Sequence, residues 1–310
     1  MTKIFIDGKA GTTGLRIYER LEARKDIELL TLSDEERKDP SARKRMLNLC
    51  DVAFLCLPDD AARESVSLIE NDNTVVIDTS TAHRTDPAWA YGFPELSPEF
   101  EEKIKTSKRI AVPGCHACGF IALVYPLIKE GLLDKDTLLS CHSITGYSGG
   151  GKKMIAEYES EERDGLLSSP RQYGIAQTHK HLKEMKAISG ISEFPVFSPI
   201  VSDFYSGMVM SVPIFSKQLC GGKTLEDVKA VYKKYYDSKI VKYKEAIDEG
   251  GFIAGNALSF KDTMEISVVG NEERMVLIAR YDNLGKGASG AAVECLNLVM
   301  GAPHERGLSI

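Results

Sequence analysis

The chain has 310 residues, of which 43% are hydrophobic and 27% charged, and its formal net charge is −6. This length exceeds one typical domain of about 100 to 200 residues, so we expect two domains or one large α/β unit. The acidic balance argues against a nucleic-acid partner, because phosphate binding depends on clustered basic residues. No apolar run approaches the roughly 18 residues that a membrane span needs, so we expect no membrane partner.

The seven cysteines are an odd number and are spread along the whole chain. Small secreted domains have dense, paired cysteines, so this distribution favours reduced thiols in a cytoplasmic protein. The opening residues, MTKIFIDG, are typical of a short strand and not of a secretory signal peptide. We therefore expect a soluble, cytoplasmic protein.

The first part of the chain alternates short apolar strands with amphipathic helices. Strands are predicted at residues 4–7, 27–32, 51–57 and 74–77, and helices at 15–23, 41–49 and 61–69. This alternation implies parallel strands joined by right-handed crossovers. The expected fold is α/β, with a Rossmann-like, doubly wound dinucleotide-binding domain that ends near residue 115.

The pattern changes after residue 135. Strands are predicted at 138–144, 209–213, 264–270 and 275–281, several of them with alternating polarity, and helices at 225–236 and 288–300. These segments predict a second, α+β domain with a mixed or antiparallel sheet, over residues 116–283.

A glycine-rich turn, GKAGTTG, follows the first strand and opens the first helix. Its glycines, Gly8, Gly11 and Gly14, form a GxxGxxG pattern and not the GxGxxG of the NAD fingerprint. They still allow a pyrophosphate to approach the helix N-terminus closely. The turn therefore indicates a dinucleotide site.

The segment after the second strand, LSDEERKDP, bears on the choice of dinucleotide. The acids at positions 34 and 35 leave an NAD ribose site open. Ser33, Arg37 and Lys38 offer a hydroxyl and two cations for a 2′-phosphate, which favours NADP.

The segment AVPGCHACG places Cys115 in a Pro-Gly turn between two apolar runs. A helix is predicted at 120–128, so the thiol would lie near a helix N-terminus, where the dipole and free N–H groups favour a thiolate. Cys115 is therefore the candidate nucleophile, and a buried cysteine at a strand end is the alternative.

Nine segments in order match one family: GKAGTTGLRI, DVAFLCLPDDAA, IDTSTAHR, YGFPEL, VPGC, GYSGGGKK, HKHLKEM, SDFYSGM and DNLGKGASGAA. Over essentially its whole length the chain resembles the N-acetyl-γ-glutamyl-phosphate reductases, in their shorter form. One departure is Cys118, which stands where the resemblance leads us to expect threonine.

The resemblance implies an enzyme of arginine biosynthesis that reduces an acyl phosphate to an aldehyde with NADPH, through a thioester on Cys115. It also implies a homodimer or homotetramer. The last helix, about 284–310, would return to residues 1–115 and complete the dinucleotide domain, leaving 116–283 as the catalytic and dimerisation domain.

The resemblance also suggests binding residues, and no metal ligand is among them. The cofactor residues would be Gly8, Gly11, Thr12, Thr13, Gly14, Ser33, Arg37, Lys38, Cys56, Leu57, Pro58, Asn283, Lys286 and Gly287. The substrate's anionic groups would meet Arg84, Ser148, Gly149, Gly150 and Lys152. Residues 148–151 could form a nest of backbone N–H groups for an anion.

His179 and His181 are the candidates for acid/base catalysis, because the ordinary pKa of imidazole, roughly 6.5, lies near neutrality. In an extended segment, two alternate residues point to the same side. One histidine could then position substrate while the other transfers protons, and the sequence does not choose between them.

Several alternatives remain open. The CHAC motif is formally CxxC, which a redox centre or half a zinc site would share, but no second CxxC exists. Under oxidant, Cys115 and Cys118 could pair reversibly. Two other interpretations of the function are a different thioester-forming semialdehyde dehydrogenase and a non-catalytic NADP-sensing protein on the same fold.

Overall fold

The computed structural model describes residues 1–33 and 35–310. The chain divides into two compact units. Unit 1 consists of residues 1–94, 98–114 and 288–308, and unit 2 of residues 95–97, 115–287 and 309–310. Within the described residues, no helix is both long enough and apolar enough to cross a membrane.

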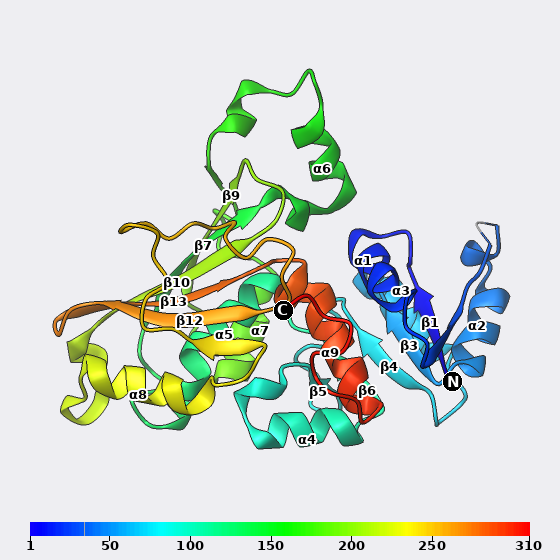
Figure 1. The fold of residues 1–310 in the computed structure, drawn as a ribbon, viewed down its shortest axis with the longest axis horizontal. Coiled ribbons are helices and arrows are strands. Elements are labelled where there is room, and N and C mark those ends of the chain that lie inside the picture. The colour runs from blue at the N-terminus through cyan, green and yellow to red at the C-terminus, as the bar shows by residue number, and fades with distance from the viewer. Residues whose placement is uncertain (34) are drawn as a thin grey trace. The chain divides into compact units, whose positions relative to one another are not determined.

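Unit 1 contains a six-stranded sheet in the order β2-β1-β3-β4-β6-β5, and every pair is parallel (Figure 1). Its strands are β1 (Thr2–Asp7), β2 (Ile27–Leu30), β3 (Val52–Leu55), β4 (Val75–Asp78), β5 (Ala90–Tyr91) and β6 (Arg109–Ala111). β3 and β4 are buried at every position, as expected of parallel strands covered on both faces.

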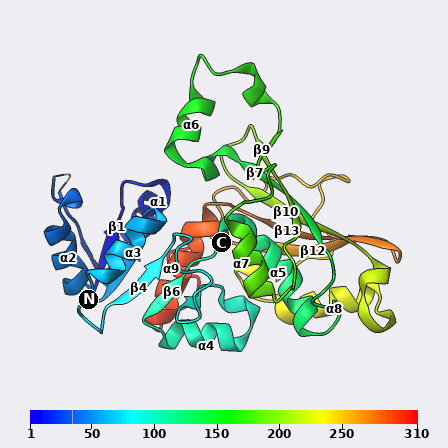
Figure 2. The same ribbon diagram turned by 180° about the vertical axis from the view of Figure 1, so that it is seen from behind.

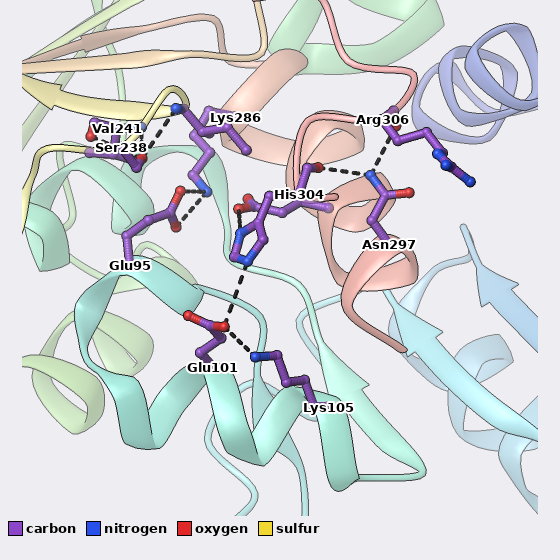
Figure 3. A network of polar contacts seen from close by, with 11 residues as sticks. Glu95, Glu101, Lys105, Ser238, Val241, Lys286, Asn297, His304 and Arg306 are labelled. Carbon is purple, nitrogen blue, oxygen red and sulfur yellow. Dashed lines mark hydrogen bonds and ion pairs between the residues drawn. The ribbon is translucent and has the colours of Figure 1, made fainter. Parts of the chain in front are cut away.

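Helices cover both faces of this sheet. They are α1 (Thr12–Leu21), α2 (Pro40–Leu49), α3 (Asp59–Ser67), α4 (Pro98–Thr106) and α9 (Gly290–Val299). Side chains of α1, α4 and α9 share one apolar cluster with the sheet, and those of α2 and α3 share another. The end of α9 is tied down by Asn297, whose Nδ2 donates to the carbonyl oxygens of His304 and Arg306 (Figure 3).

Unit 2 contains a seven-stranded sheet in the order β11-β12-β13-β10-β7-β9-β8. The strands are β7 (Ser140–Gly146), β8 (Arg171–Gln172), β9 (Val196–Ser202), β10 (Met208–Phe215), β11 (Val241–Tyr243), β12 (Met264–Gly270) and β13 (Arg274–Tyr281). The pairs β7–β9 and β11–β12 are parallel and the others antiparallel, so the sheet is mixed.

The helices of unit 2 are α5 (Cys115–Lys129), α6 (Gly151–Glu159), α7 (His181–Ser189) and α8 (Leu225–Tyr235). α5 packs on β10 and β13 and lies beside α7 (Figure 2). From residue 116 to residue 124 it is buried at every position, so it is a core helix and not an amphipathic surface helix.

Pro126 lies inside α5, where a proline lacks the N–H that would bond the carbonyl four residues earlier. That carbonyl belongs to Ala122, and the hydroxyl of Tyr236 donates to it at 2.7 Å. The next carbonyl, of Leu123, accepts from the hydroxyl of Tyr232 at 2.5 Å. Two buried tyrosines from the region of α8 therefore supply donors beside the position that the proline leaves without one.

The structure confirms the expected fold class, a doubly wound parallel domain together with a mixed-sheet α+β domain. The predicted strands and helices are present, with ends that shift by a few residues. The predictions did not include β5, α4, α6, β8, α7, β9 and β11.

Candidate active site

Cys115 is the first residue of α5, as the sequence predicted for a nucleophile at a helix N-terminus. Its side chain is partly exposed, whereas the residues on both sides of it are buried. The first N–H groups of a helix have no partner within the helix and point toward its N-terminal end. Negative charge that forms on or near the Cys115 sulfur is therefore favoured.

Tyr281, at the end of β13, fixes the first turn of α5. Its hydroxyl donates to the carbonyl oxygen of Cys115 at 2.6 Å and accepts from the N–H of Gly119 at 3.1 Å. A Cβ on residue 119 would lie 2.4 Å from this hydroxyl, so the position requires glycine. Burial raises the pKa of Tyr281 well above its ordinary value, which keeps the hydroxyl protonated.

His116, the residue after the candidate nucleophile, is buried. Its Nδ1 lies 2.7 Å from Ser143 Oγ and its Nε2 lies 2.6 Å from the hydroxyl of Tyr173. Burial, with a smaller contribution from His179, lowers the pKa of His116 to about 3. The ring is therefore neutral at physiological pH, with one nitrogen donating and the other accepting.

Tyr173 belongs to the same cluster. Burial raises its pKa, and the negative charge of a Cys115 thiolate raises it further, so the phenol and the thiol are electrostatically coupled. The hydrogen bond to His116 orients the hydroxyl. The phenol therefore remains a neutral hydrogen-bonding group near the candidate nucleophile.

The rings of the two candidate acid/base histidines both lie close to the ring of His116. The ring centroids of His179 and His181 are 4.7 Å apart, and each lies 5.6 Å from that of His116. The expectation of an extended segment was wrong, because His181 is the first residue of α7. The rings meet because the chain turns into this helix, and Nδ1 of His179 accepts from the backbone N–H of His181 at 3.2 Å.

This contact distinguishes the two histidines. Because Nδ1 of His179 accepts a hydrogen bond, the neutral ring carries its proton on Nε2. His179 is partly exposed, whereas His181 is only 5% exposed. Burial, and then the charge of Lys180, lower the pKa of His179, so its ring is neutral at physiological pH.

Lys286 and Gly287 pass close to the start of α5. The ammonium of Lys286 bonds both carboxylate oxygens of Glu95, at 2.8 and 2.7 Å, and is only 1% exposed (Figure 3). A Cβ on residue 287 would lie 3.1 Å from the Cβ of Cys115. Cofactor binding by Lys286 and Gly287 stays a prediction, and the structure places Gly287 beside the nucleophile.

Asn283 links the segment that follows β7 to the one that follows β13. Its Oδ1 accepts from the N–H of Gly207 at 2.9 Å, and its Nδ2 donates to Ser148 Oγ at 3.0 Å. The N–H of Ser148 donates to the carbonyl of Tyr205, so this residue does not add an open N–H to the expected anion nest. Gly149, Gly150 and Lys152 are exposed. Substrate binding by these residues stays a prediction.

Arg84 is buried in unit 1 and donates to two backbone carbonyls. Its Nε bonds Val112 at 2.8 Å and one Nη bonds Thr79 at 2.9 Å. These contacts hold the segments after β4 and β6. A substrate role for Arg84 stays a prediction.

Unit 1 contains a cavity of about 590 Å³ at the carboxyl ends of β1 and β2. Four of the predicted cofactor residues line it, namely Gly8, Arg37, Lys38 and Leu57. Its volume lies within the usual range of ligand pockets, about 300 to 1,000 Å³. Its place, at the strand ends of an open parallel sheet, is where such sheets bind nucleotides.

The glycine turn closes tightly on the loop after β3. Gly8 has φ +88°, and a Cβ there would lie 2.3 Å from the carbonyl oxygen of Cys56. A Cβ on Gly14 would lie 2.5 Å from the carbonyl oxygen of Gly8. Gly11 is the N-cap of α1, and Thr12 and Thr13 are the first two residues of this helix. The turn therefore leaves the backbone at the N-terminus of α1 without side chains at its glycines, so that a pyrophosphate can approach it closely.

Three further predicted cofactor residues of unit 1, Ser33, Cys56 and Pro58, are close in sequence to residues that line this cavity. The Oγ of Ser33 accepts from the N–H of Glu36, the first residue of the short helix that carries Arg37 and Lys38. Cys56 follows β3, burial raises its pKa to about 12, and Pro58 is the N-cap of α3. Asp34 lies outside the described residues.

The sequence analysis did not single out His116, Ser143, Tyr173 or Tyr281 as site residues. His116 stands next to the nucleophile, which was the one signal in the sequence that could have indicated it. The other three come from different strands and loops and form no local motif.

Two family models match the chain. One describes the NAD binding domain of semialdehyde dehydrogenase and matches residues 3–105, and the other describes its dimerisation domain and matches residues 115–283. A Nostoc sp. protein named N-acetyl-gamma-glutamyl-phosphate reductase 2 is 43% identical over 318 residues, covering 99% of each chain. A Chelativorans sp. protein named N-acetyl-gamma-glutamyl-phosphate reductase is 46% identical over 305 residues, covering 96% of this chain and 98% of the relative.

The chain belongs to the N-acetyl-γ-glutamyl-phosphate reductase family. The resemblance drawn from the nine segments is thus confirmed, and the family consists of oxidoreductases. Among solved structures, aspartate semialdehyde dehydrogenase II of Vibrio cholerae, in complex with ASA, matches with a TM-score of 0.72. It covers 97% of this chain and 98% of its own at 16% identity, which shows that this reductase family shares the semialdehyde dehydrogenase fold.

Proposed function

We propose that this protein reduces N-acetyl-γ-glutamyl phosphate to N-acetyl-glutamate 5-semialdehyde and phosphate with NADPH, in arginine biosynthesis. The observation that carries the proposal is the thiol of Cys115 on the first residue of α5, next to a cluster of three histidines. The relatives at 43% and 46% identity, named for this reaction, support it.

Cys115 is the nucleophile of the proposed reaction. Its thiolate attacks the acyl-phosphate carbon, the carbon–oxygen bond to the phosphate breaks, and a thioester and free phosphate result. The N-terminus of α5 stabilises negative charge on the thiolate before the attack and on the carbonyl oxygen during it. Tyr281 holds this turn in place, and the missing Cβ of Gly287 leaves room for the Cβ of Cys115.

His179 is the proposed acid/base residue. In the neutral ring, Nδ1 accepts the hydrogen bond from the N–H of His181. Nε2 is therefore the nitrogen that can transfer a proton while this hydrogen bond is in place. The partial exposure of His179 permits contact with substrate. His181 supports that ring from the start of α7 and is the second candidate.

The cavity of unit 1 is the proposed NADPH site, because a glycine turn too tight for a Cβ and two cations among its lining residues fit a pyrophosphate and a 2′-phosphate. Bound NADPH supplies the hydride that reduces the thioester. We assign the glycine turn to the pyrophosphate and Ser33, Arg37 and Lys38 to the 2′-phosphate. Thr12, Thr13, Cys56, Leu57 and Pro58 would contact the rest of the cofactor.

The residues that hold the substrate's anionic groups are proposed from the sequence and the resemblance. Gly149, Gly150 and Lys152 are exposed and combine backbone donors with a cation, which suits phosphate or the α-carboxylate. Ser148 and Asn283 fix the backbone of this segment. Arg84 has two donors committed to carbonyls, so it would act mainly by shaping the loops around it.

The assembly we propose is a homodimer, or a homotetramer built from it, formed through the face of the unit 2 sheet that lies opposite α5. On β7, β9 and β10 this face presents Ile144, Val196 and Phe215, which are 39%, 61% and 60% exposed. Exposed large apolar side chains on adjacent strands are typical of an interaction surface. The dimerisation domain model matches this unit.

A cytoplasmic location is also proposed, because all seven cysteines are outside disulfides in the described residues.

The reverse reaction tests the proposal. N-acetyl-glutamate 5-semialdehyde, phosphate and NADP⁺ are mixed with the wild type, with Cys115→Ala and with Cys220→Ser, and NADPH absorbance is followed. We expect phosphate-dependent turnover that falls roughly 10⁴-fold or more in Cys115→Ala and persists in Cys220→Ser, a change to a partly exposed thiol elsewhere. Binding of NADP⁺ by a folded wild type without turnover would overturn the reductase proposal and favour a sensor.

A further inference from the structure

Two cysteines lie in the first turn of α5. Cys115 is its first residue and Cys118 its fourth. Residues three apart in a helix lie on the same face, with Cβ atoms about 5 to 6 Å apart. A disulfide needs about 3.5 to 4.5 Å between the Cβ atoms, so a shift of roughly 1 to 2 Å within one turn would allow the bond.

The same stretch of backbone contacts both cysteines. The Sγ of Cys118 lies 3.7 Å from the carbonyl oxygen of Lys286. At the next residue, Gly287, a Cβ would lie 3.1 Å from the Cβ of Cys115. The two side chains therefore border one short segment, which agrees with their common face on α5.

The two thiols differ in what can reach them. Cys115 is partly exposed, so a small oxidant in solution can reach its sulfur. Cys118 is fully buried, and burial raises the pKa of its thiol despite the opposing effect of Lys286. Solution oxidants therefore react first at Cys115, while Cys118 remains a protonated thiol beside it.

We propose that Cys118 is a resolving cysteine that converts an oxidised Cys115 into a reversible disulfide. A hydroperoxide oxidises the Cys115 thiol to a sulfenic acid, and the peroxide is reduced to water or an alcohol. The Cys118 sulfur then displaces the sulfenic hydroxyl, its proton leaves with that hydroxyl as water, and the S–S bond forms. The two thiols together lose two electrons, and a dithiol returns them.

The disulfide would remove the nucleophile from use without destroying it. A sulfenic acid that has no neighbouring thiol is oxidised further to a sulfinic acid, which dithiols do not reverse. The pair thus protects the thiol on which the proposed reaction depends. The chemistry itself depends only on the two cysteines, so it goes beyond the proposed function.

The test compares the wild type with Cys118→Ser after hydrogen peroxide. Serine nearly matches the volume of cysteine, and its hydroxyl can face the same Lys286 carbonyl. Cys141→Ser, at another fully buried cysteine, is the matched control. Trypsin releases residues 110–129 as one peptide that contains both cysteines and no other, and its mass reports their state. Activity is measured before peroxide, after it, and after dithiothreitol, each relative to the untreated variant.

For the wild type and Cys141→Ser we expect loss of activity, a 110–129 peptide lighter by two hydrogens that resists alkylation, and full recovery with dithiothreitol. For Cys118→Ser we expect the peptide to gain two oxygens and the activity not to return. A wild-type peptide that gains oxygens, or that joins Cys115 to a different cysteine, would overturn the proposal, whether or not Cys118→Ser folds. Because the readout is a mass, it stands even for a protein that does not turn over the proposed substrate.

Discussion

At the scale of single residues, His116 is unusual because it is a buried histidine whose two ring nitrogens both have partners. Ser143 and Tyr173 come from different parts of unit 2, and the imidazole joins them. Protonation would leave a buried cation among three other aromatic side chains, those of Phe197, His179 and His181. The fold therefore holds the neutral ring and resists its protonation.

The consequence is a loss of stability in acid. The pKa of His116 is about 3 in the fold and near 6.5 in the unfolded chain, so below pH 6.5 the unfolded chain binds a proton that the fold does not. Stability from this residue is complete above pH 6.5 and falls by about 1.4 kcal/mol per pH unit down to about pH 3. We expect a loss of about 2 kcal/mol between pH 8 and pH 5.

The check is urea unfolding at pH 8 and pH 5 for the wild type and His116→Gln, which cannot titrate. The variant should be less stable at pH 8, by about 1 to 3 kcal/mol for the altered buried hydrogen bonds. The difference between the two proteins should shrink by about 2 kcal/mol at pH 5. An unchanged difference would show that His116 binds its proton as readily in the fold as in the unfolded chain.

The sequence analysis identified the nucleophile because its signals are local. A Pro-Gly turn, a cysteine and a following apolar run are adjacent, so their physics can be judged without a fold. The partners of His116 were out of reach for the opposite reason. Ser143 looks like any alternate residue of a strand, and Tyr173 lies in a loop whose path depends on β8 and β9.

At the scale of elements, α5 depends on Tyr281 of β13 at its start. The hydroxyl bridges the first turn, and the absence of a Cβ on Gly119 makes the space for it. Gly119→Ala would drive a methyl group into the hydroxyl and toward Met210, so we expect a cost of about 1 to 3 kcal/mol from overpacking.

Thermal and urea unfolding of Gly119→Ala measure this cost. Gly165→Ala is the control, because a Cβ there meets nothing within 4 Å, and it should change stability little. Adding Tyr281→Phe to Gly119→Ala removes the atom nearest the new methyl group, so the double variant should lose less than the sum of the two single changes. Additive losses would locate the strain elsewhere.

Elements with a clear hydrophobic pattern could be predicted from the sequence, and elements whose residues favour conflicting structures could not. β1, β3 and β4 are short, and each contains an uninterrupted apolar run, at residues 4–6, 52–55 and 75–77. β9 contains Pro199 and was not predicted, because proline is unusual within a strand. α7 was missed because its first residue was read as part of an extended histidine pair, and only the tertiary path shows the helix beginning there.

At the scale of the whole molecule, the proposed dimer face can be disrupted without touching the site. Ile144 lies on β7 and points away from α5, since its neighbours Ser143 and Thr145 are buried on the other side. Ile144→Glu places a charge in the proposed interface, where an unpaired charge is costly. We expect a shift from a dimer or tetramer toward the 34.1 kDa monomer.

Sedimentation velocity over a range of concentrations measures this shift. Leu166→Glu is the control, because Leu166 is 69% exposed but lies outside the sheet, and it should leave the assembly unchanged. A wild type that is already monomeric would overturn the proposed assembly. An oligomer indifferent to Ile144→Glu would place the interface on another face.

The last helix of the chain completes the core of unit 1. Ala291, Val293 and Leu296 of α9 fill the same apolar cluster as Ile4 of the first strand, and Asn297 fastens the final residues to the helix. During synthesis the N-terminal strands emerge from the ribosome long before α9 exists. The part of their apolar face that α9 covers therefore stays exposed while residues 115–287 of unit 2 are made, and unit 1 completes its core only after that segment has been synthesised.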